Sequence, residues 1–319
     1  MHILIGEEQR FEQEKALVTV VILTYQKFAT LPLTLQSVLK QNYPSIEIIL
    51  SDDGSEVFPF AEIQEWLRKG NNSCPTPITI LHSPCNRGIV QNAKIALTHA
   101  RGRYIKFLSP GDMFLSENSL NNLVSFAEKT NCLIITSISA VYTGDSRKTL
   151  YNYPSRKCIH RLRQSNPEQA YKLLARRNCI SAPATMYHRE YFEQYGIDET
   201  YKYLDDWPVW LSFSRLGGSI GVLEEVTTYY LVDGTGTSSS NAFDSRLLRD
   251  DLRHCYEKEI VPFISKLNVL SRWVIGYRYA SLRELSLQPK ERIVYAPLIL
   301  YDAAKRLLKR IVLKHGRNV

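Results

Sequence analysis

The first hundred residues alternate short apolar runs with segments of helical periodicity, and this alternation constrains the fold more than any other feature. Apolar runs without polar alternation are typical of strands that a parallel sheet buries on both faces. Helix-length segments lie between these runs, near residues 30–42, 58–69 and 88–100. Strands separated in this way predict right-handed βαβ units and an open α/β sheet. The four runs are VTVVILT (18–24), IEIIL (46–50), ITILH (78–82) and YIKFL (104–108).

The rest of the chain carries weaker signals. TNCLIITSISAVYTG (130–144) predicts a buried strand and a turn, and residues 145–178 predict a basic loop with a short helix. Over residues 179–218 we expect a strand, a short helix, a loop and a longer helix from about Asp205. Residues 219–232 predict a strand pair or one bent strand, followed by a Gly- and Ser-rich break and a helical pattern. The signals predict three parts: a lead at 1–17, an α/β domain at 18–235 and a helical C-terminal region at 236–319.

Composition narrows the class of protein. Hydrophobic residues make up 44% of the chain and charged residues 23%, as in globular proteins. The chain start lacks the pattern of a signal peptide, and no segment approaches the roughly 18 to 20 apolar residues of a membrane-spanning helix. Six cysteines without a CxxC pair favour reduced thiols over a zinc ribbon or a disulfide framework. We therefore expect a cytoplasmic protein that is soluble or peripheral on a membrane.

The net charge of +8 is concentrated near the C-terminal end. Residues 290–319 hold eight Lys or Arg against Glu291 and Asp302, so this segment contributes +6 of the total. Because the main domain is nearly neutral, nucleic-acid binding is not expected. Residues 297–319 predict a helix with one apolar and one basic face. Two interpretations stay open: the helix lies on an anionic membrane surface, or it packs on the domain with a solvated basic face.

Carboxylates follow two of the predicted strands at the points where the strands end. Asp52 and Asp53 come directly after one buried run, and Asp112 follows another within SPGDMF. Ligands bind outside the carboxyl ends of the strands in open α/β sheets. Asp-Gly and Gly-Asp pairs are also good turn formers, so either site alone is equally explained by a turn. Their recurrence at two strand ends predicts a ligand site at this edge of the sheet.

Three segments, taken in order, resemble the family 2 glycosyltransferases, which are inverting enzymes with the GT-A fold. The family's first strand, Thr-Tyr turn, first helix and Asp-Asp-Gly-Ser loop are matched by VTVVILTYQKFATLPLTLQSVLKQNYPSIEIILSDDGSE. Its Asn-x-Gly helix and the following strand are matched by NRGIVQNAKIALTHARGRYIKFLSPGD, and its acceptor-side turn and helix by FEQYGIDETYKYLDDWPVWLSFSRLGG. The match covers about residues 18–240. It implies a Rossmann-like, mostly parallel central sheet flanked by helices, with the C-terminal helical region as an extension.

The resemblance implies a binding site for a nucleotide-sugar, usually a UDP-sugar. Asp53 would accept the uracil imide hydrogen, and Thr24 and Tyr25 would lie under the base. Asp52 would either contact the donor or brace the loop. The implied donor-binding set is completed by three residues of the Asn-x-Gly helix: Asn86, Gly88 and Lys94.

The resemblance also implies a metal ion and a catalytic base. Asp112 matches the residue that touches the metal in relatives, and one carboxylate with two diphosphate oxygens suits Mg²⁺ or Mn²⁺. Residues 109–111, Ser-Pro-Gly, stand where the fullest form of the motif carries further acidic residues. Asp206 matches the base that activates the acceptor hydroxyl, with Asp205 orienting it. Alternatively, Asp205 caps the N-terminus of the following helix.

These features predict a metal-dependent bacterial enzyme that moves a single sugar to a hydroxyl of a growing surface glycan, carried on a polyprenyl lipid. Such an enzyme would be cytoplasmic, or peripheral on the inner face of the cell membrane. VLSRW (269–273) lacks the Gln of the processive Gln-x-x-Arg-Trp motif, which favours a single addition. Asp233 is expected to open a turn or to replace a phosphate-side His. Two alternatives remain: a nucleotidyltransferase, although TYQKFATLP lacks its Gly-rich basic loop, and a degenerate relative that binds without catalysis.

Overall fold

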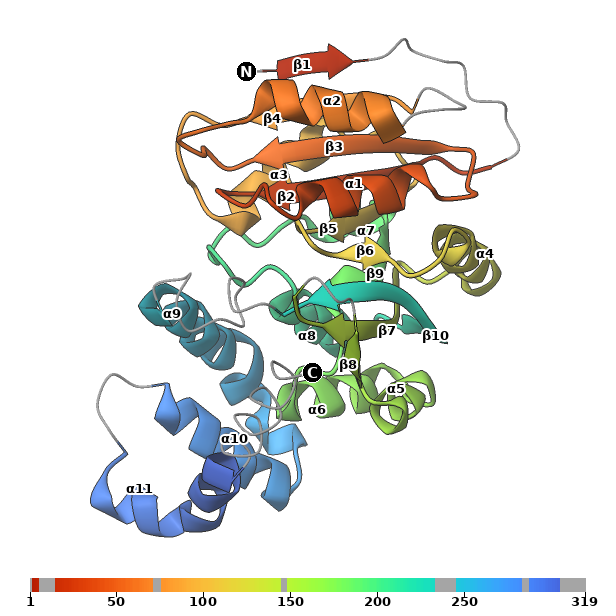
Figure 1. The fold of residues 1–319 in the computed structure, drawn as a ribbon. Coiled ribbons are helices and arrows are strands. Elements are labelled where there is room, and N and C mark those ends of the chain that lie inside the picture. Colours follow the sequence, from red (N-terminus) through yellow and green to blue (C-terminus); the bar gives the residue numbers. More distant parts are fainter. Residues whose placement is uncertain are drawn as a thin grey trace. The chain divides into compact units, whose positions relative to one another are not determined.

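The computed structural model describes six segments of the chain: residues 2–5, 15–70, 76–144, 148–232, 245–282 and 287–304. The chain divides into two compact units, residues 1–251 and 252–319, and this division lies beyond the boundary predicted at residue 235. Within the described residues, the first unit contains a ten-stranded sheet in the order β1-β4-β3-β2-β5-β9-β7-β10-β6, with β8 beside β7 (Figure 1). A central sheet surrounded by helices confirms the predicted α/β class.

The elements of the first unit alternate in chain order much as the sequence predicts. Their bounds are β1 His2–Ile5, β2 Val18–Thr24, α1 Leu31–Leu39, β3 Ile46–Asp52, α2 Phe60–Gly70, β4 Ile78–His82, α3 Ile89–His99, β5 Tyr104–Leu108, β6 Met113–Phe114, α4 Ser119–Thr130, β7 Ile134–Tyr142, β8 Thr149–Tyr153, α5 Arg156–Arg163, α6 Pro167–Arg176, η1 Ala182–Ala184, β9 Thr185–His188, α7 Arg189–Tyr195, α8 Trp207–Arg215 and β10 Ile220–Leu231. The four predicted apolar runs are β2, β3, β4 and β5, and each is buried along most of its length.

The half of the sheet that these four strands form is parallel. β2 pairs with β3 on one side and with β5 on the other, and β4 pairs with β3. Helices α1 and α2 lie on one face of this half and α3 on the other (Figure 1). The chain therefore reverses its direction across the sheet between β2 and β5. Ligands bind beyond the carboxyl ends of the strands at such a reversal.

The other half of the sheet is mixed, where the sequence predicts a mostly parallel arrangement. β9 pairs antiparallel with both β5 and β7, and β8 pairs antiparallel with β7. β10 runs parallel to β7 as one long strand with two register shifts. Of the two alternatives predicted for this segment, the single bent strand is therefore correct. The edges are β1, which joins β4 from within the predicted lead, and the short β6, which joins β10; both pair antiparallel.

Residues 145–178 contain more regular structure than the predicted loop and short helix. β8, α5 and α6 all lie in this range. In α6 a capping box fixes the first turn, with Asn166 accepting from Gln169 N at 2.9 Å and the Gln169 side chain accepting from Asn166 N at 3.0 Å. α5 buries only Ile159 and Leu162 among its eight residues, so its many basic side chains hide the apolar pattern.

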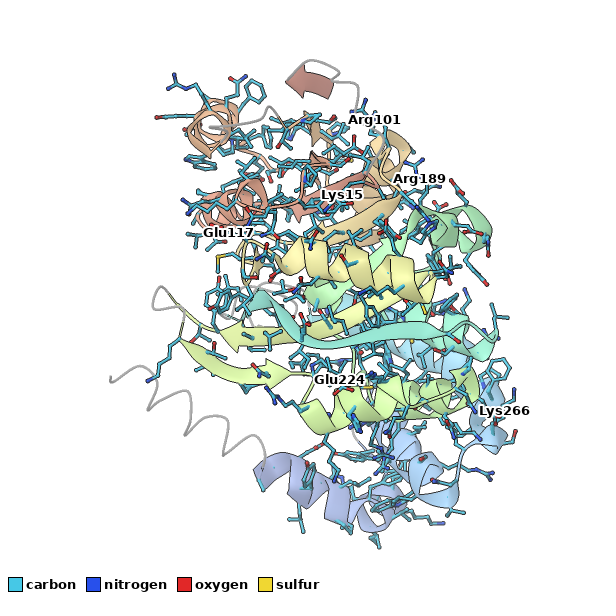
Figure 2. The ribbon with its side chains drawn as sticks, turned by 90° about the vertical axis from the view of Figure 1, so that its right-hand side faces the viewer. Lys15, Arg101, Glu117, Arg189, Glu224 and Lys266 are labelled. Atoms are coloured by element: carbon cyan, nitrogen blue, oxygen red, sulfur yellow. The ribbon has the colours of Figure 1, made fainter. Side chains whose placement is uncertain are left out.

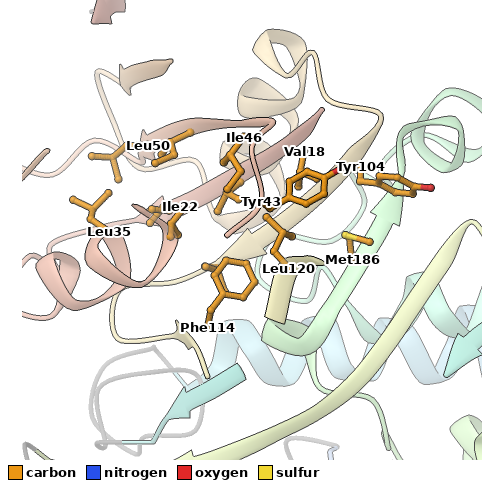
Figure 3. Close-up of a cluster of buried hydrophobic side chains, with 14 of the residues drawn as sticks. Val18, Ile22, Leu35, Tyr43, Ile46, Leu50, Tyr104, Phe114, Leu120 and Met186 are labelled. Atoms are coloured by element: carbon orange, nitrogen blue, oxygen red, sulfur yellow. The ribbon is translucent and has the colours of Figure 1, made fainter. Parts of the chain in front are cut away.

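The main hydrophobic core fills the space between the parallel strands and the helices α1, α2 and α4. Alternate residues of each strand contribute to it, among them Ile22 of β2 and Leu50 of β3, which face Leu35 of α1 (Figure 3). Phe114 of β6 and Leu120 of α4 extend the same cluster toward the second half of the sheet. This packing fixes the strand ends from which the candidate site is built.

A buried carboxylate ties the opposite end of the strands together. Glu47 of β3 accepts hydrogen bonds from the Thr19 hydroxyl at 2.5 Å, Arg101 N at 2.6 Å and Arg101 Nε at 2.9 Å. Arg189 Nε donates a hydrogen bond to the Gly102 carbonyl at 3.0 Å. Both arginines, Arg101 and Arg189, lie on the same flank of the domain (Figure 2). These contacts lock the connection from α3 into β5.

The second unit is helical, as predicted. Its elements, including the helix that spans the division, are α9 Ser245–Cys255, the π-helical segment η2 Tyr256–Ile260, the 3-10 helix η3 Val261–Lys266, α10 Val269–Ser281 and α11 Pro289–Val294. The ring centroids of Tyr277 and Tyr295 lie 5.6 Å apart, and the Tyr277 hydroxyl donates a hydrogen bond to Asp302 Oδ2 at 3.1 Å. Most of the predicted basic amphipathic segment, residues 305–319, lies outside the described residues. Within the described residues, none of the helices combines the length and the apolar character that a membrane crossing requires.

Candidate active site

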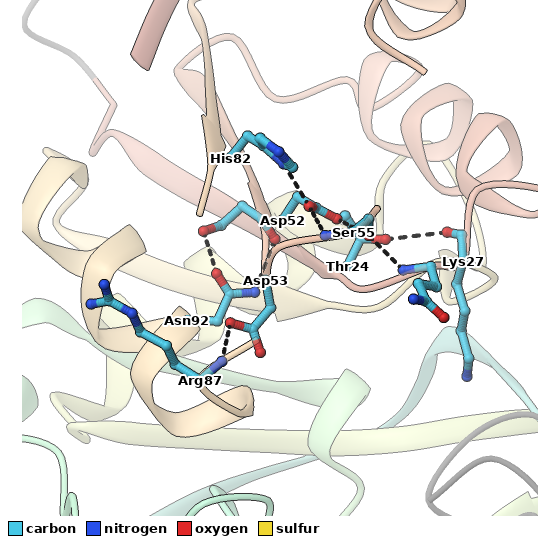
Figure 4. Close-up of polar contacts among 10 residues, drawn as sticks. Thr24, Lys27, Asp52, Asp53, Ser55, His82, Arg87 and Asn92 are labelled. Carbon is cyan, nitrogen blue, oxygen red and sulfur yellow. Dashed lines mark hydrogen bonds and ion pairs between the residues drawn. The ribbon is translucent and has the colours of Figure 1, made fainter. Parts of the chain in front are cut away.

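Asp52 ends β3 with its side chain fully buried. Its Oδ2 accepts a hydrogen bond from Ser55 N at 2.8 Å, and its Oδ1 accepts one from the Ser55 hydroxyl at 2.6 Å. His82, at the end of β4, places Nδ1 2.8 Å from the same Oδ2 (Figure 4). Asp52 therefore braces the loop after β3 against the neighbouring strand, which is one of the two roles expected for it.

Asp53 connects this loop to the start of α3. Its Oδ1 accepts from Arg87 N at 2.9 Å (Figure 4), and its Oδ2 accepts from Gly88 N at 2.8 Å. Loss of hydration raises the pKa of the Asp53 carboxyl, and the two N–H groups oppose this shift. Each oxygen keeps a second lone pair, so a further contact with an imide N–H is compatible with this geometry. The uracil contact of Asp53 stays a prediction.

The Thr24–Tyr25 turn follows β2 beside the Asp53 loop. The Thr24 carbonyl accepts from Asp53 N at 2.9 Å, and its hydroxyl donates to the Lys27 carbonyl at 3.2 Å. Gln26 has a positive φ of 51° and donates its N–H to the Ser55 hydroxyl at 2.7 Å. The turn and the loop after β3 are thus fixed to one another, and Tyr25 presents an exposed ring at this edge.

Asp112 lies in the turn between β5 and β6. Its Oδ2 accepts from Ser109 N at 3.1 Å, and its Oδ1 accepts from Leu231 N at the end of β10 at 3.3 Å. Loss of hydration raises the pKa of Asp112 to about 7, against the two N–H groups and the charge of Lys106. In this arrangement Asp112 holds together the ends of two distant strands.

Lys106 is a buried cation of β5 that sequence analysis did not single out. Its Nζ donates to the Pro183 carbonyl and, at 3.3 Å, to the Phe107 carbonyl. Burial lowers the pKa of Lys106 to about 7, and attraction to Asp112 opposes that shift. Its place in a predicted strand did not reveal that its charged group is buried. The only available signal was a charge within an otherwise apolar run.

The donor set at this turn fits a divalent ion only in part. Within the described residues, no group of three or more His, Cys, Asp or Glu side chains is placed to hold a metal. Asp112 supplies one carboxylate, and both of its oxygens already accept N–H groups. One such ligand suits an ion that takes most of its oxygen ligands from a bound diphosphate and water, as Mg²⁺ commonly does. The residues do not fit a metal centre built by the protein alone.

Asp205 and Asp206 immediately precede α8. Asp206 is the N-cap of this helix and accepts a hydrogen bond from Trp207 N. The helix cap is therefore Asp206 itself and not Asp205, the residue considered for that role. The Asn178 side chain, at the end of a segment that follows α6, also hydrogen-bonds Asp206. Asp206 thus combines a fixed position at a helix N-terminus with a polar partner from a distant segment.

Both carboxyl groups of this pair have a raised pKa. Loss of hydration raises the pKa of Asp206 to about 6, although hydrogen bonds from Trp207 N and Asn178 lower it in part. Loss of hydration of the carboxyl group, which lines a small cavity, and repulsion from Asp206 raise the pKa of Asp205 as well. A carboxylate with a pKa near 6 is well matched to proton abstraction at neutral pH.

The turn before Asp205 packs directly on the start of α3. The Lys202 carbonyl accepts from Val90 N at 3.3 Å, and a Cβ on Gly88 would lie 2.6 Å from that carbonyl oxygen. A small cavity of about 40 Å³ beside Asp205 is lined by Val90 and by Phe107 of β5, among other mainly apolar side chains. The segment that Asp53 holds is therefore the same segment on which the Asp205–Asp206 turn rests.

Three further predicted residues belong to α3 and to the loop before it. Asn86 and Gly88 lie beside the Asp53 loop, with Gly88 at a φ of 95°. Lys94 forms an ion pair with Glu199, and Gln91 donates to the same carboxylate at 2.8 Å. Asp233 lies outside the described residues. Sequence reasoning missed Asn178, His82 and Lys202, because no local pattern relates them to the carboxylates that they contact.

Comparisons with known proteins identify the family. A profile described as Glycosyl transferase family 2 matches residues 19–196, more than half of the chain. The chain belongs to glycosyltransferase family 2. One curated relative of this family 2 glycosyltransferase is "UDP-Glc:alpha-D-GlcNAc-diphosphoundecaprenol beta-1,3-glucosyltransferase WfaP" of Escherichia coli, 26% identical over 82% of this chain and 97% of the relative. Another is an uncharacterized glycosyltransferase of Haemophilus influenzae, 20% identical over 95% of this chain and 97% of the relative.

Solved structures show the same fold at low sequence identity. Residues 1–349 of S. aureus TarS, in complex with UDP-GlcNAc, align with a TM-score of 0.59 at 14% identity, covering 95% of this chain and 92% of that one. The mannosyltransferase PcManGT of Pyrobaculum calidifontis, in complex with GDP-Man and Mn²⁺, aligns with a TM-score of 0.57 at 14% identity, covering 92% and 81%. The GT-A fold predicted for this family 2 glycosyltransferase is confirmed, and family membership excludes the nucleotidyltransferase alternative.

Proposed function

We propose that this chain is an inverting glycosyltransferase that moves a single sugar from a UDP-sugar to a hydroxyl of a growing, polyprenyl-linked glycan in bacterial polysaccharide synthesis. Two relatives support the substrate classes: WfaP is named for UDP-glucose and a diphosphoundecaprenol-linked acceptor, and TarS forms a complex with UDP-GlcNAc. The observation that carries the proposal is the packing of the turn before Asp205 on the α3 start that Asp53 holds. Through this packing, a donor loop and a base-bearing turn share one structural element.

On the donor side, Asp53 accepts the imide hydrogen of the uracil while Thr24 and Tyr25 form the surface under the ring. Asn86 and Gly88 complete the wall of this site at the start of α3. A contact between Lys94 and the diphosphate requires its ion pair with Glu199 to open, and ion pairs between exposed side chains are weak. The donor site is thus built mainly from loops whose backbones are held by buried carboxylates.

On the acceptor side, Asp206 removes the proton of the attacking hydroxyl, within about 2.6–3.2 Å of it. The hydroxyl oxygen bonds to the anomeric carbon from the face opposite the diphosphate, whose bond to that carbon breaks, and the configuration inverts. Asn178 orients Asp206 through a hydrogen bond, and Asp205 precedes Asp206 in the same turn. When bound together with the donor, Mg²⁺ or Mn²⁺ would neutralise charge on the leaving diphosphate, with Asp112 as its protein ligand.

We also propose that the protein is peripheral on the inner face of the cell membrane, where polyprenyl-linked acceptors are found. The second unit exposes Ile293, Leu300 and Tyr301 close in sequence to Lys290 and Arg292. Apolar side chains interspersed with basic ones suit an anionic lipid surface. Co-sedimentation with anionic but not zwitterionic vesicles is expected, and absence of binding to both would contradict this placement.

The test of the proposed function compares Asp206→Asn with the wild type in an assay of UDP release and product formation. Asn is also a good helix N-cap, so the substitution keeps the fold but removes the base. We expect transfer to fall by about 10²–10⁴-fold. Donor affinity, measured by thermal shift with UDP-, GDP- and dTDP-sugars, should be unchanged. A wild type that binds a donor but never turns it over, with or without EDTA, would support the alternative of a non-catalytic binding protein.

A further inference from the structure

Asp251 lies on α9 and gathers three consecutive backbone N–H groups on one carboxylate oxygen. Its Oδ2 accepts from Lys202 N at 2.9 Å, Tyr203 N at 2.6 Å and Leu204 N at 3.0 Å. The Asp251 side chain is 8% exposed, so these hydrogen bonds are shielded from water. Successive N–H groups that converge on one point form a concave anion site, and here the anion is a side chain of the same unit.

The segment that Asp251 holds leads directly into the proposed base. Leu204 is followed by Asp205 and Asp206, and residues 201–206 belong to neither a helix nor a strand. Backbone N–H groups in such a segment lack the regular partners that fix a helix or a sheet. Asp251 supplies partners for three of them in a row. Hydrogen bonds to Asp251 therefore fix the conformation of residues 202–204, which no helix or strand fixes.

The same segment also meets the donor side of the site. Lys202 donates its N–H to Asp251 and accepts from Val90 N with its carbonyl, while Asp53 accepts from Gly88 N two residues earlier. Asp251 thus holds residues 202–204, these residues contact the start of α3, and Asp53 holds the start of α3 from the other side. Displacement of residues 202–204 would move the Asp205–Asp206 turn relative to the donor loop, and the relative position of these two parts determines the approach of the acceptor.

We propose that Asp251 is a positioning residue for sugar transfer, which fixes residues 202–204 and thereby holds Asp206 at the anomeric carbon of the donor. This inference rests on the proposed function, in which Asp206 is the base. Asp251 touches neither substrate, and it acts through the backbone of the turn. A displacement of a catalytic group by about 1 Å lowers rates by as much as about 10²-fold, which is the scale expected when this clamp is lost.

The experiment compares Asp251→Ala and Asp251→Asn with matched controls, Asp250→Ala and Asp250→Asn. Asp250 is the exposed neighbour on the same helix, so its variants remove the same charge without touching the clamp. Three quantities are measured on the full chain: kcat with the donor and acceptor, the Kd of UDP, and amide hydrogen exchange by mass spectrometry. The melting temperature of each variant reports its folded fraction.

For Asp251→Ala we expect kcat per folded molecule to fall about 30- to 100-fold. The Kd of UDP should change by less than about threefold, because Asp53 and its loop keep their contacts. Amides 202–206 should exchange at least about tenfold faster while those of α3 do not change. Asp251→Asn should be partly rescued, because its carbonyl oxygen still accepts N–H groups without the charge. Both Asp250 variants should match the wild type in kcat per folded molecule and in the exchange of amides 202–206.

Two results would overturn the proposal. One is unchanged exchange of amides 202–206 in Asp251→Ala, which would mean that the carboxylate does not hold the turn. The other is faster exchange with normal kcat per folded molecule, which would mean that the held geometry does not matter for transfer. Failure of the proposed function is distinguishable, because the wild type itself would then show no turnover. In that case the exchange measurement still decides whether Asp251 positions the turn.

Discussion

The substitution Asp53→Asn tests whether the strand-end carboxylate is a structural clasp, a donor contact or both. Asp53 accepts two hydrogen bonds at 2.9 and 2.8 Å, and each hydrogen bond to a charged group contributes about 1.5–3 kcal/mol. Asparagine keeps one carbonyl acceptor but turns an NH₂ group toward the second N–H. Removal of a buried charge, whose burial raises the pKa of Asp53, offsets part of the loss. We expect a net decrease of about 2 kcal/mol in the free energy of unfolding.

Urea denaturation measures this change, and calorimetric titration with UDP measures donor affinity. Glu56→Gln is the control, because Glu56 is exposed in the same loop and loses the same charge. If Asp53 also contacts the base, the Kd of UDP should rise at least about tenfold in Asp53→Asn at a temperature where the protein is fully folded. An unfolding free energy within about 0.5 kcal/mol of that of Glu56→Gln would refute the clasp. An unchanged Kd would refute the donor contact.

Three further outcomes follow from the geometry. In the wild type, kcat/KM should fall below about pH 6, because Asp206 must be ionised to act as a base. Asn178→Ala should move this acid limb to higher pH, because it removes a hydrogen bond that lowers the pKa of Asp206. An acid limb that does not move would contradict the assignment of Asp206 as the base. Gly88→Ala should lower both the melting temperature and kcat, because Gly88 has a φ of 95° and the added Cβ would lie 2.5–2.6 Å from atoms of Lys202. Wild-type values of both would show that Lys202 can move away from the new methyl group at little cost. Glu47→Ala should lower the free energy of unfolding, measured by urea titration, by about 3 kcal/mol, because Arg101 and Thr19 lose their buried acceptor. The kcat of the folded protein should be retained. A lower kcat would show that Glu47 also helps to hold the candidate active site in place.

The parallel half of the sheet was predictable because each of its strands is buried on both faces. Four continuous apolar runs result, and helices of nine to eleven residues separate β2, β3 and β4 and return the chain to β5. The mixed half was not predictable in the same way. β8 has no apolar run, because most of its side chains are exposed or half-buried, and β9 has only four residues. Their pairings depend on contacts with β7 and β5 that local sequence does not encode.

The candidate acidic residues were predicted from motifs, but the partners that the structure gives them were not. Asp52 meets His82 from the next strand, Asp53 meets backbone N–H groups just before α3, and Asp206 meets Asn178. Each pair joins segments 28 or more residues apart, and backbone N–H groups carry no sequence signature at all. The same limit explains the helix cap: adjacent aspartates are equivalent in a pattern, and only the geometry of α8 assigns the cap to Asp206.

The start of α3 contacts both parts of the proposed site, the loop that carries Asp53 and the turn that carries Asp205 and Asp206. A helix N-terminus presents several N–H groups that its own backbone leaves unpaired. Here Gly88 N is taken by Asp53 and Val90 N by the Lys202 carbonyl, so one helix end satisfies groups from both sides of the site. Gly88 permits this because any side chain at that position would overlap Lys202. In the proposed function, backbone contacts at the start of α3 therefore fix the position of the donor loop relative to the acceptor turn, and with it the spacing between Asp53 and Asp206.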